Sequence, residues 1–180
     1  RTGFGITAEG DMLAALGLRY GSDEAINFSV SVHRALAVAA YSSSVTMAKE
    51  RGAFPIYDTE REMNNPFVKR LAEADPELYK EMSIHGRRNV ALLTIAPTGT
   101  VSICTQTTSG IEPVFMVSYK RRKKINPNDK ESSSRKVVQD SNGDYFEEFN
   151  VFHPKFIDWL RISNYNVDEV MQMNDKDLQD

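Results

Sequence analysis

Cysteine is nearly absent from this sequence, and its histidines are scattered. Cys104 is the one cysteine among 180 residues, so a disulfide framework within the chain is impossible and a cysteine-based zinc site is disfavoured. The histidines are His33, His85 and His153, and no two of them have the short spacing of metal ligands. We therefore expect no metal site in this chain. The scarcity of cysteine favours a reducing compartment, the cytoplasm.

The sequence also lacks long apolar runs and a strong net charge. No apolar stretch approaches the roughly 18 residues of a membrane-spanning helix. Residues 1–3 do not begin a signal peptide. The formal net charge is -3, which argues against a protein dominated by nucleic-acid binding. Neither a membrane nor a nucleic acid is therefore expected as a partner.

Apolar residues are present in a proportion that can form a core, 41% of the chain. The first residue is Arg1 instead of an initiator methionine, and the glycine-rich opening is typical of packed structure. The polar end, MNDKDLQD, contains no stop signal. These features predict that the sequence is a fragment of a longer protein.

The spacing of the apolar residues predicts mostly helices. The longest begins after Ser22, an N-cap residue followed by two acidic residues, and continues to Gly52, about eight turns by helix pitch. Shorter helices are predicted near residue 12, after residue 59, and over 66–74, 76–85, 153–160 and 167–171.

One segment has the pattern of a buried strand that ends abruptly. Residues 90–96 form a continuous apolar run, which predicts a strand covered on both faces, and Pro97 stops it. The sequence TGTVS follows. Its glycine permits a positive φ or a close backbone approach, and a helix starting there would point free N–H groups at an anion. The stretch is either a phosphate cradle or a turn whose hydroxyls only cap the helix. The residues alone leave both interpretations open.

Two nearby residues have a structural interpretation beside a functional one. Cys104 can be a nucleophile, but a small buried hydrophobe is the commoner role for such a cysteine. Glu112 lies in an apolar stretch, 111–115, that is expected to return to the interior. A carboxylate there needs a partner, for which Arg87 or Arg88 is the candidate.

Residues 120–144 differ in composition from the rest of the chain and follow a candidate second strand at 117–119. Their basic residues are Lys120, Arg121, Arg122, Lys123, Lys124, Lys130, Arg135 and Lys136. Such a run can bind nucleic acid or phosphate. Because aromatic residues are not interleaved with it, an exposed, solvated loop or arm is the favoured interpretation.

Several stretches of the chain match the pattern of a known family. They are RTGFGITAEGDMLAALGLRYGSDEA, AKERGAFPIYD, RRNVALLTIAPTGTVS, QTTSGIEPVF, the Tyr-Lys-Arg-Arg at 119–122, and FHPKFIDWL. Together they closely resemble the large catalytic subunit of ribonucleotide reductases. The Thr-Gly-Thr of the loop resembles most the adenosylcobalamin-dependent (class II) branch, since class I relatives tend to carry other combinations, such as Ser-Glu-Thr.

The resemblance implies an α/β fold, the ten-stranded α/β barrel of that family. The chain would be a helix-rich, C-terminal fragment of the barrel with few strands of its own. Residues 1–119 would be the late part of the catalytic barrel domain, 120–145 an exposed basic and polar insertion, and 146–180 a C-terminal helical segment.

The resemblance also implies a role for the TGTVS stretch. In the family, the loop between a late strand and its helix holds the phosphates of the nucleotide. The matching residues here are Thr98, Gly99, Thr100, Val101 and Ser102. The catalytic cysteines of the family have no counterpart in this chain, and Cys104 matches none of them. The chain is therefore expected to contain no catalytic residue and to be inactive alone.

For the longer parent, the resemblance implies a vitamin B12-dependent ribonucleotide reductase with adenosylcobalamin as cofactor. It would replace the ribose 2′-hydroxyl of a ribonucleotide by hydrogen for DNA precursor synthesis. A thioredoxin-like thiol reductant would be its partner, and the parent would be a dimer. Two alternatives remain: a fragment of a class I large subunit, which takes its radical from a second subunit, and a non-enzymatic nucleotide- or RNA-binding module that uses the basic arm.

Overall fold

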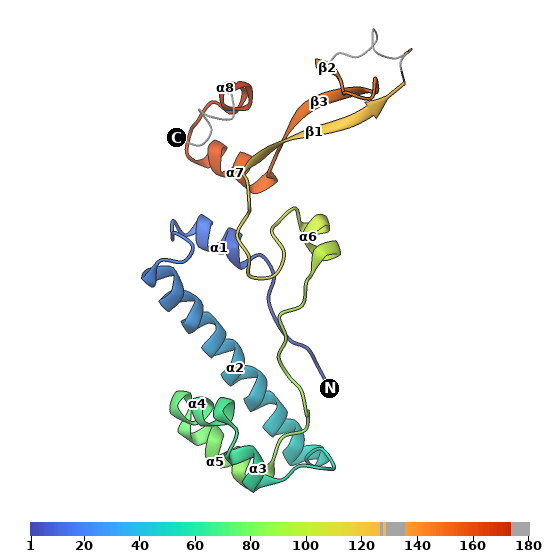
Figure 1. Ribbon diagram of the computed structural model, residues 1–180. Coiled ribbons are helices and arrows are strands. Elements are labelled where there is room, and N and C mark those ends of the chain that lie inside the picture. The colour runs from blue at the N-terminus through green and yellow to red at the C-terminus, as the bar shows by residue number, and fades with distance from the viewer. Residues whose placement is uncertain (127, 129–135, 174–180) are drawn as a thin grey trace. The chain divides into compact units, whose positions relative to one another are not determined.

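The computed structural model describes residues 1–126, 128 and 136–173 (Figure 1). The chain divides into two compact units. The first contains Arg1–Val101 and Thr108–Glu112, and the second contains Ser102–Thr107 and Pro113–Asp180. Lys130 and Arg135 of the basic run, and the end of the chain from residue 174, lie outside the described residues.

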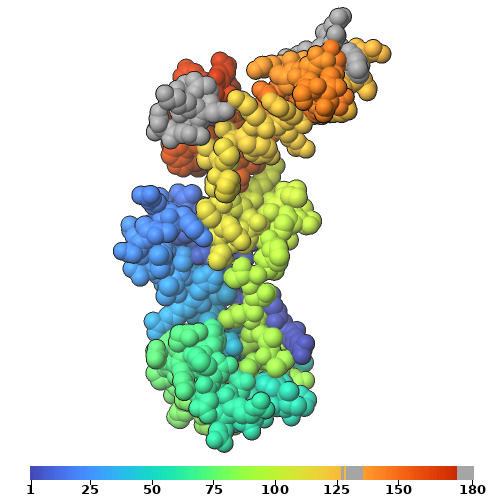
Figure 2. Space-filling model, viewed as in Figure 1, coloured from blue at the N-terminus to red at the C-terminus, as the bar shows by residue number. Residues whose placement is uncertain are grey.

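The first unit is helical. Its helices are α1 Glu9–Ala15, α2 Asp23–Arg51, α3 Thr59–Met63, α4 Pro66–Ala74 and α5 Pro76–His85. The predicted helices are confirmed. They could be predicted because helix caps act locally: the Ser22 hydroxyl accepts from the Ala25 N–H (3.3 Å), and the side chains of Asn65 and Asp75 cap α4 and α5 in the same way. The helices α3, α4 and α5 form one closely packed body, drawn in green in Figure 2.

The core of the first unit lies where α2 packs on α4 and α5. Its buried residues are Tyr41, Val45, Val68, Leu71, Leu78, Met82 and Leu92. Met82 and Val68 are almost fully removed from solvent, at 0% and 1% exposure. Burial of this apolar set stabilises the helices, above all α4 and α5, since helices of 9 or 10 residues are marginal on their own.

The predicted strand at 90–96 is wrong in two respects. The segment is extended, but it forms only one isolated bridge, a parallel one between Leu93 and Phe4. Only Leu92 is buried, while Val90 and Ile95 are 39% and 45% exposed, so the segment is not covered on both faces. A strand needs a continuous ladder with a neighbour, and the described residues offer this segment only the short stretch around Phe4.

Two glycines allow that pairing. The Phe4 N–H donates to the Leu92 carbonyl (2.7 Å), and the Thr94 N–H donates to the Phe4 carbonyl (3.0 Å). A Cβ atom at Gly5 would lie 1.9 Å from the Thr94 carbonyl oxygen, and one at Gly3 would lie 2.8 Å from Thr94 Cγ2. Side chains at these positions are therefore excluded by the close approach of the two segments.

The second unit contains an antiparallel sheet of three described strands in the order β1-β3-β2 (Figure 1). The strands are β1 Ser118–Ile125, β2 Lys136–Gln139 and β3 Tyr145–Phe152, and two helices follow, α7 Pro154–Ile162 and α8 Val167–Gln172. The start of a second strand near 118 and both helices are confirmed. The predicted loop is wrong over 120–125, which belong to β1, and residues 146–152 are strand instead of helix. The predicted exposure of β1 is confirmed.

Two further expectations of burial are wrong. Phe115 is 98% exposed, so the stretch around it does not return to the interior of the described structure. Cys104 is exposed on α6 (Gly99–Thr105) instead of buried. Both predictions relied on the apolar character of single residues, which does not by itself determine burial.

None of the described helices is both long enough and apolar enough to cross a bilayer.

Candidate functional site

The TGTVS stretch forms the start of α6, as its sequence predicts. The helix begins at Gly99, directly after Thr98. Thr98 has a φ of 48°, in the left-handed region, whereas Gly99 does not. Of the two roles left open for the glycine, a positive φ or a close backbone approach, the positive φ is therefore found at Thr98 instead. A β-branched residue in that region is an outlier that costs about 1–3 kcal/mol, so neighbouring contacts must hold it there.

The side chain of Thr98 makes those contacts. Its Oγ1 atom accepts a hydrogen bond from the Gly110 N–H (2.9 Å) and lies 2.9 Å from the hydroxyl oxygen of Thr7. The loop is thus tied to the segment that precedes α1 and to the segment at 108–110. Its hydrogen-bond partners Thr7 and Gly110 are remote in sequence, which is more than a local helix cap requires.

The remaining residues of the stretch differ in their exposure. Gly99, Thr100 and Val101 are exposed, and a Cβ atom added at Gly99 would meet nothing within 4 Å. Ser102 is buried at 9% exposure, and its carbonyl accepts from the Thr107 N–H (3.0 Å). The boundary between the two units falls between Val101 and Ser102. Thr98, Gly99, Thr100 and Val101 therefore belong to the first unit, and Ser102 belongs to the second.

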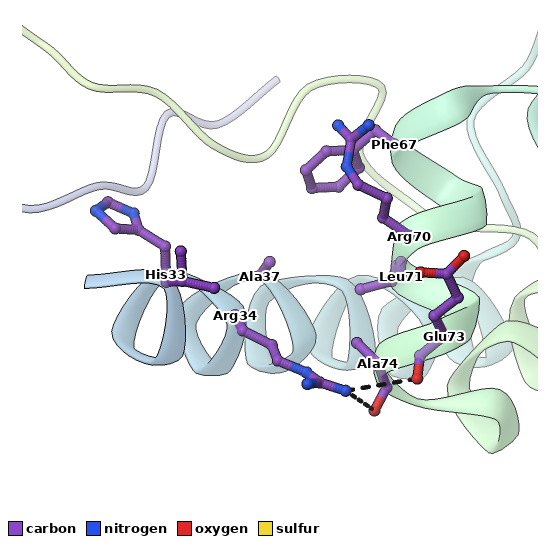
Figure 3. A pocket seen from close by; sticks show the side chains of 9 residues that line it. His33, Arg34, Ala37, Phe67, Arg70, Leu71, Glu73 and Ala74 are labelled. Atoms are coloured by element: carbon purple, nitrogen blue, oxygen red, sulfur yellow. Dashed lines mark hydrogen bonds between the residues drawn. The ribbon is translucent and has the colours of Figure 1, made fainter. Parts of the chain in front are cut away.

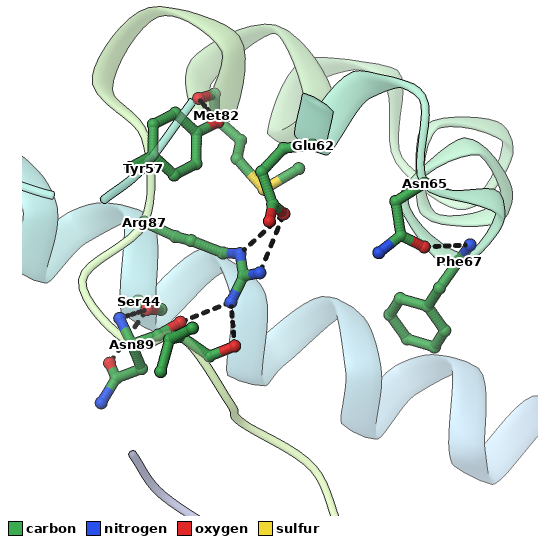
Figure 4. Close-up of polar contacts among 9 residues, drawn as sticks. Ser44, Tyr57, Glu62, Asn65, Phe67, Met82, Arg87 and Asn89 are labelled. Carbon is green, nitrogen blue, oxygen red and sulfur yellow. Dashed lines mark hydrogen bonds and ion pairs between the residues drawn. The ribbon is translucent and has the colours of Figure 1, made fainter. Parts of the chain in front are cut away.

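The chain leading into this loop is anchored by a buried arginine that Figure 4 shows. Arg87 is 5% exposed. Its guanidinium donates to Glu62 Oε2 from Nε (3.2 Å) and from Nη2 (2.8 Å), and from Nη1 to the carbonyls of Asn89 (2.5 Å) and Val90 (2.9 Å). The ion pair thus fixes the entry of the 90–96 segment against α3.

Aromatic rings and a second hydrogen-bond set complete this anchor. The Arg87 guanidinium lies 5.5 Å from the Tyr41 ring centroid and 5.2 Å from that of Phe54, which are cation–π distances. Burial raises the pKa of Tyr41 above its ordinary value, opposed by Arg87 and reinforced by the Glu62 carboxylate. Ser44 of α2 donates to Asn89 Oδ1 (2.9 Å) and accepts from the Asn89 N–H (3.0 Å).

The predicted partner of Glu112 is wrong. Arg87 pairs with Glu62 instead, and Arg88 donates to the carbonyls of Arg51 (3.4 Å) and Gly52 (3.3 Å) at the end of α2. Glu112 is exposed, so its carboxylate remains hydrated and needs no buried cation.

Sequence reasoning missed the residues that bracket the loop. They are Thr7, Asp11, Thr108 and Gly110, and all of them lie in the first unit. The Asp11 carboxylate accepts from the Thr108 N–H (2.9 Å), and the Thr7 hydroxyl also reaches the Thr108 carbonyl (3.5 Å). The one sequence signal is that Thr7, Asp11 and Thr108 are polar residues among the small and apolar residues of the opening stretch and of 98–110. That signal does not specify which of them meet.

A groove between α2 and α4 is a separate feature of the first unit (Figure 3). It has a volume of about 370 Å³ and an apolar floor that includes Val30, Ala37 and Phe67. Arg34 on its edge donates to the Glu73 and Ala74 carbonyls at the end of α4. This use as a helix C-cap accounts for Arg34 without a ligand.

The basic strand of the second unit is partly neutralised by its neighbours. Arg122 pairs with Glu148 (3.0 Å), Lys136 lies 3.7 Å from the same carboxylate, and Lys124 pairs with Asp144 (2.5 Å). The hydrogen bond from Arg122 holds the pKa of Glu148 below its ordinary value, with Lys136 reinforcing the effect. Within the part of the chain that the structure describes, no cluster of three or more His, Cys, Asp or Glu residues could hold a metal ion.

Comparisons with known proteins place the chain in a family. Residues 1–178 match the family model described as the ribonucleotide reductase barrel domain. A vitamin B12-dependent ribonucleoside-diphosphate reductase from Mycobacterium tuberculosis is 35% identical over 121 residues, 67% of this chain and 15% of that protein. The protein of the same name from Thermoplasma acidophilum is 32% identical over 122 residues, 67% of this chain and 13% of that protein.

A third relative, the ribonucleoside-diphosphate reductase subunit alpha of Treponema pallidum, is 30% identical over 125 residues, 68% of this chain and 15% of that protein. The chain thus spans 13–15% of the length of these relatives. The family match confirms the predicted α/β barrel fold class, with described residues that are mostly helical and include few strands. The chain belongs to the ribonucleotide reductase family and matches its barrel domain.

Proposed function

We propose that the chain is part of a vitamin B12-dependent ribonucleotide reductase and supplies the loop that holds the phosphates of the substrate. The observation that supports the loop most is the open start of α6. There Gly99 and Thr100 are exposed, and nothing in the fold occupies the space beside Gly99. Free N–H groups at a helix start favour an anion, and a missing Cβ lets a phosphate approach the backbone.

Each residue of the loop has a distinct part in this proposal. Thr98 turns the chain and sets the direction of α6. Gly99, Thr100 and Val101 form the first turn of α6, whose N-terminus favours an anion, and the exposed Thr100 adds a hydroxyl donor. Ser102 is buried and completes the first turn of α6.

The named relatives support the activity of the parent. Two of them carry vitamin B12 dependence in their names, and three act as ribonucleoside-diphosphate reductases by name. The parent would replace the ribose 2′-hydroxyl of a ribonucleoside diphosphate by hydrogen for DNA precursor synthesis. A thioredoxin-like thiol would restore its cysteines, and it would work as a cytoplasmic dimer.

Adenosylcobalamin, when bound to the parent, would supply the radical. We assign none of the described residues to that cofactor. Cys104 lies exposed on α6 and matches no cysteine of the reaction. The contribution of this chain is therefore binding and orientation of the substrate.

Substitution of Thr100 in the full-length protein tests the loop. Thr100→Val keeps the side-chain volume and removes the hydroxyl donor. We expect the affinity for CDP, measured by isothermal titration calorimetry, to fall about fivefold, the effect of one lost hydrogen bond to an anion. The thermal unfolding midpoint should stay unchanged. A loss of stability equal to the loss of affinity would instead support a purely helix-capping role.

One observation favours each of two other candidate functions. The relative named subunit alpha favours a class I enzyme that draws its radical from a second subunit. The exposed basic strand β1 favours an RNA-binding module, which predicts tight, salt-sensitive RNA binding by the 180-residue chain. Absence of measurable RNA binding in filter assays at physiological salt would eliminate the RNA-binding candidate.

A further inference from the structure

We propose that Thr7 and Asp11 are positioning residues of the phosphate loop, a role that rests on the function proposed above. Neither residue belongs to the loop. Thr7 precedes α1 and Asp11 lies within it, yet both bond to residues about a hundred positions later in the chain. Together they form a bracket around the loop, which we define as Thr7, Asp11, Thr98, Thr108 and Gly110.

The bracket holds the near end of the loop through Thr98. The hydroxyl oxygens of Thr7 and Thr98 are 2.9 Å apart, and Thr98 Oγ1 also accepts from the Gly110 N–H (2.9 Å). These two contacts use the Thr98 hydroxyl within the protein. Thr98 therefore serves the loop by orienting its backbone, and Thr7 acts on the site through Thr98.

The bracket also ties α1 to the segment at 108–110, which contacts the loop through Gly110 and Thr98. The Thr108 N–H donates to Asp11 Oδ2 (2.9 Å), and the Gly110 carbonyl accepts from the Glu9 N–H (3.2 Å). Glu9 is itself buried at 5% exposure, and its carboxylate lies 2.8 Å from His33 Nε2 on α2. The long helix α2 thus fixes α1, and α1 in turn holds the 108–110 segment to which Thr98 is bonded.

Backbone strain is concentrated at this bracket. Among the described residues other than glycine, four have a positive φ, and three of these lie in or beside the bracket: Ala8 (64°), Thr98 (48°) and Gln106 (55°). The Thr108 hydroxyl is also buried without a hydrogen-bond partner in the described structure. Strained conformations persist when surrounding contacts determine them, and they cluster at ligand clamps. The strain and the unpaired Thr108 hydroxyl indicate that the surrounding contacts, and not local backbone preference, determine the position of the loop.

A loop that is fixed before the ligand arrives binds more tightly, because less freedom is lost on binding. Removal of the Thr7 hydroxyl should free Thr98 from its left-handed conformation and let the start of α6 move. The backbone at Gly99 and Thr100 would then change its orientation. Affinity for the phosphate groups should fall although no contact to the ligand has been removed.

The test compares variants of the full-length reductase that contains this chain. Thr7→Val is isosteric and removes the hydroxyl, Thr7→Ser restores it, and Asp11→Ala removes the acceptor of the Thr108 N–H. Thr46→Val is the matched control, because the exposed Thr46 hydroxyl bonds only to the Ser42 carbonyl of its own helix. The readouts are KM and kcat for CDP reduction and the thermal unfolding midpoint of each variant.

We expect Thr7→Val and Asp11→Ala to raise KM for CDP about fivefold with kcat changed less than about twofold. Thr7→Ser and Thr46→Val should match the unsubstituted enzyme. If Thr7→Val does not fold, the same criterion applies to Asp11→Ala. An unchanged KM in the folded bracket variants, with Thr100→Val still impaired, would overturn the positioning role and leave the proposed function standing. An unchanged KM in Thr100→Val would instead overturn the proposed function.

Discussion

A glycine in such a loop can supply a left-handed backbone conformation or leave open space beside the backbone. Here these two features occur at different residues, Thr98 and Gly99. Thr98 takes the left-handed backbone conformation, and Gly99 takes only the position with open space beside it. The fold therefore does not need glycine at 99 for conformation or for packing. A requirement for glycine there would have to come from the ligand.

Gly99→Ala separates these two demands. The new Cβ meets nothing within 4 Å, and alanine is favoured over glycine in helices by up to about 1 kcal/mol, so stability should be unchanged or slightly higher. Affinity for CDP should nevertheless fall at least about fivefold, because the methyl group occupies the space proposed for a phosphate. Calorimetric titration and thermal unfolding of the full-length variant measure both effects.

Gly86→Ala is the matched control for that substitution. Gly86 has a φ of 69°, and its Cβ would lie 2.7 Å from Ala53 Cβ, so this variant should lose stability without a selective loss of CDP affinity. Unimpaired CDP binding by Gly99→Ala would contradict a phosphate at this position.

Arg87 shows what a single residue contributes to the fold beneath the loop. Its charge and that of Glu62 are 6% and 18% exposed, and the arginine also donates to two backbone carbonyls. Arg87→Ala leaves the carboxylate without its cation, which is expected to cost about 3–5 kcal/mol of unfolding free energy. Urea unfolding of the full-length variant measures the loss. Arg88→Ala, whose hydrogen bonds are longer and exposed, should cost far less; equal costs would contradict this role for Arg87.

At the scale of elements, the helices could be predicted from sequence, whereas of the strands only the start of β1 could. Pro66 and Pro76 with their preceding caps, Asn65 and Asp75, act within one turn, so the starts of α4 and α5 are determined locally. The 90–96 segment depends on a neighbour ninety residues away, and its apolar composition says nothing about whether that neighbour forms a full ladder.

Beyond its start, the strand β1 escaped prediction for the opposite reason. Its residues 120–124 are all basic and exposed, and a solvated loop has the same composition. What makes them a strand is β3, which places Glu148 opposite Arg122 and Glu147 opposite Lys123. Cross-strand pairs of opposite charge stabilise a sheet, but the sequence does not show which residues will be opposite. The bracket of the phosphate loop was missed for the same reason, since its members are joined by contacts across the chain.

The sheet of the second unit should weaken in acid. The hydrogen bond from Arg122 lowers the pKa of Glu148 in the folded chain, while in the unfolded chain it returns to its ordinary value of 4.5. The contribution of Glu148 to stability is therefore complete above pH 4.5 and is lost as the pH falls through the lowered folded value. Glu148→Gln removes this dependence, so the unfolding midpoint of the variant should vary less below pH 4.5 than that of the unsubstituted chain. Identical pH profiles would contradict the pairing.

At the scale of the whole molecule, we propose that the chain carries the binding side of a reaction whose catalytic residues lie elsewhere in the parent. It spans 13–15% of the length of relatives that are named as reductases. Its described structure exposes large apolar side chains, including Phe115 at 98% and Ile162 at 81%. The family and the barrel could be predicted from sequence because RRNVALLTIAPTGTVS is a specific stretch, whereas the activity is proposed for the longer parent.

The most direct measurement of this account is reduction of CDP by the full-length protein with a dithiol reductant, in the presence and absence of adenosylcobalamin. We predict that deoxycytidine diphosphate forms only when adenosylcobalamin is added, and that Thr100→Val raises the KM for CDP in that reaction. Formation of the product without cobalamin, dependent instead on a second protein subunit, would contradict the assignment to the vitamin B12-dependent branch.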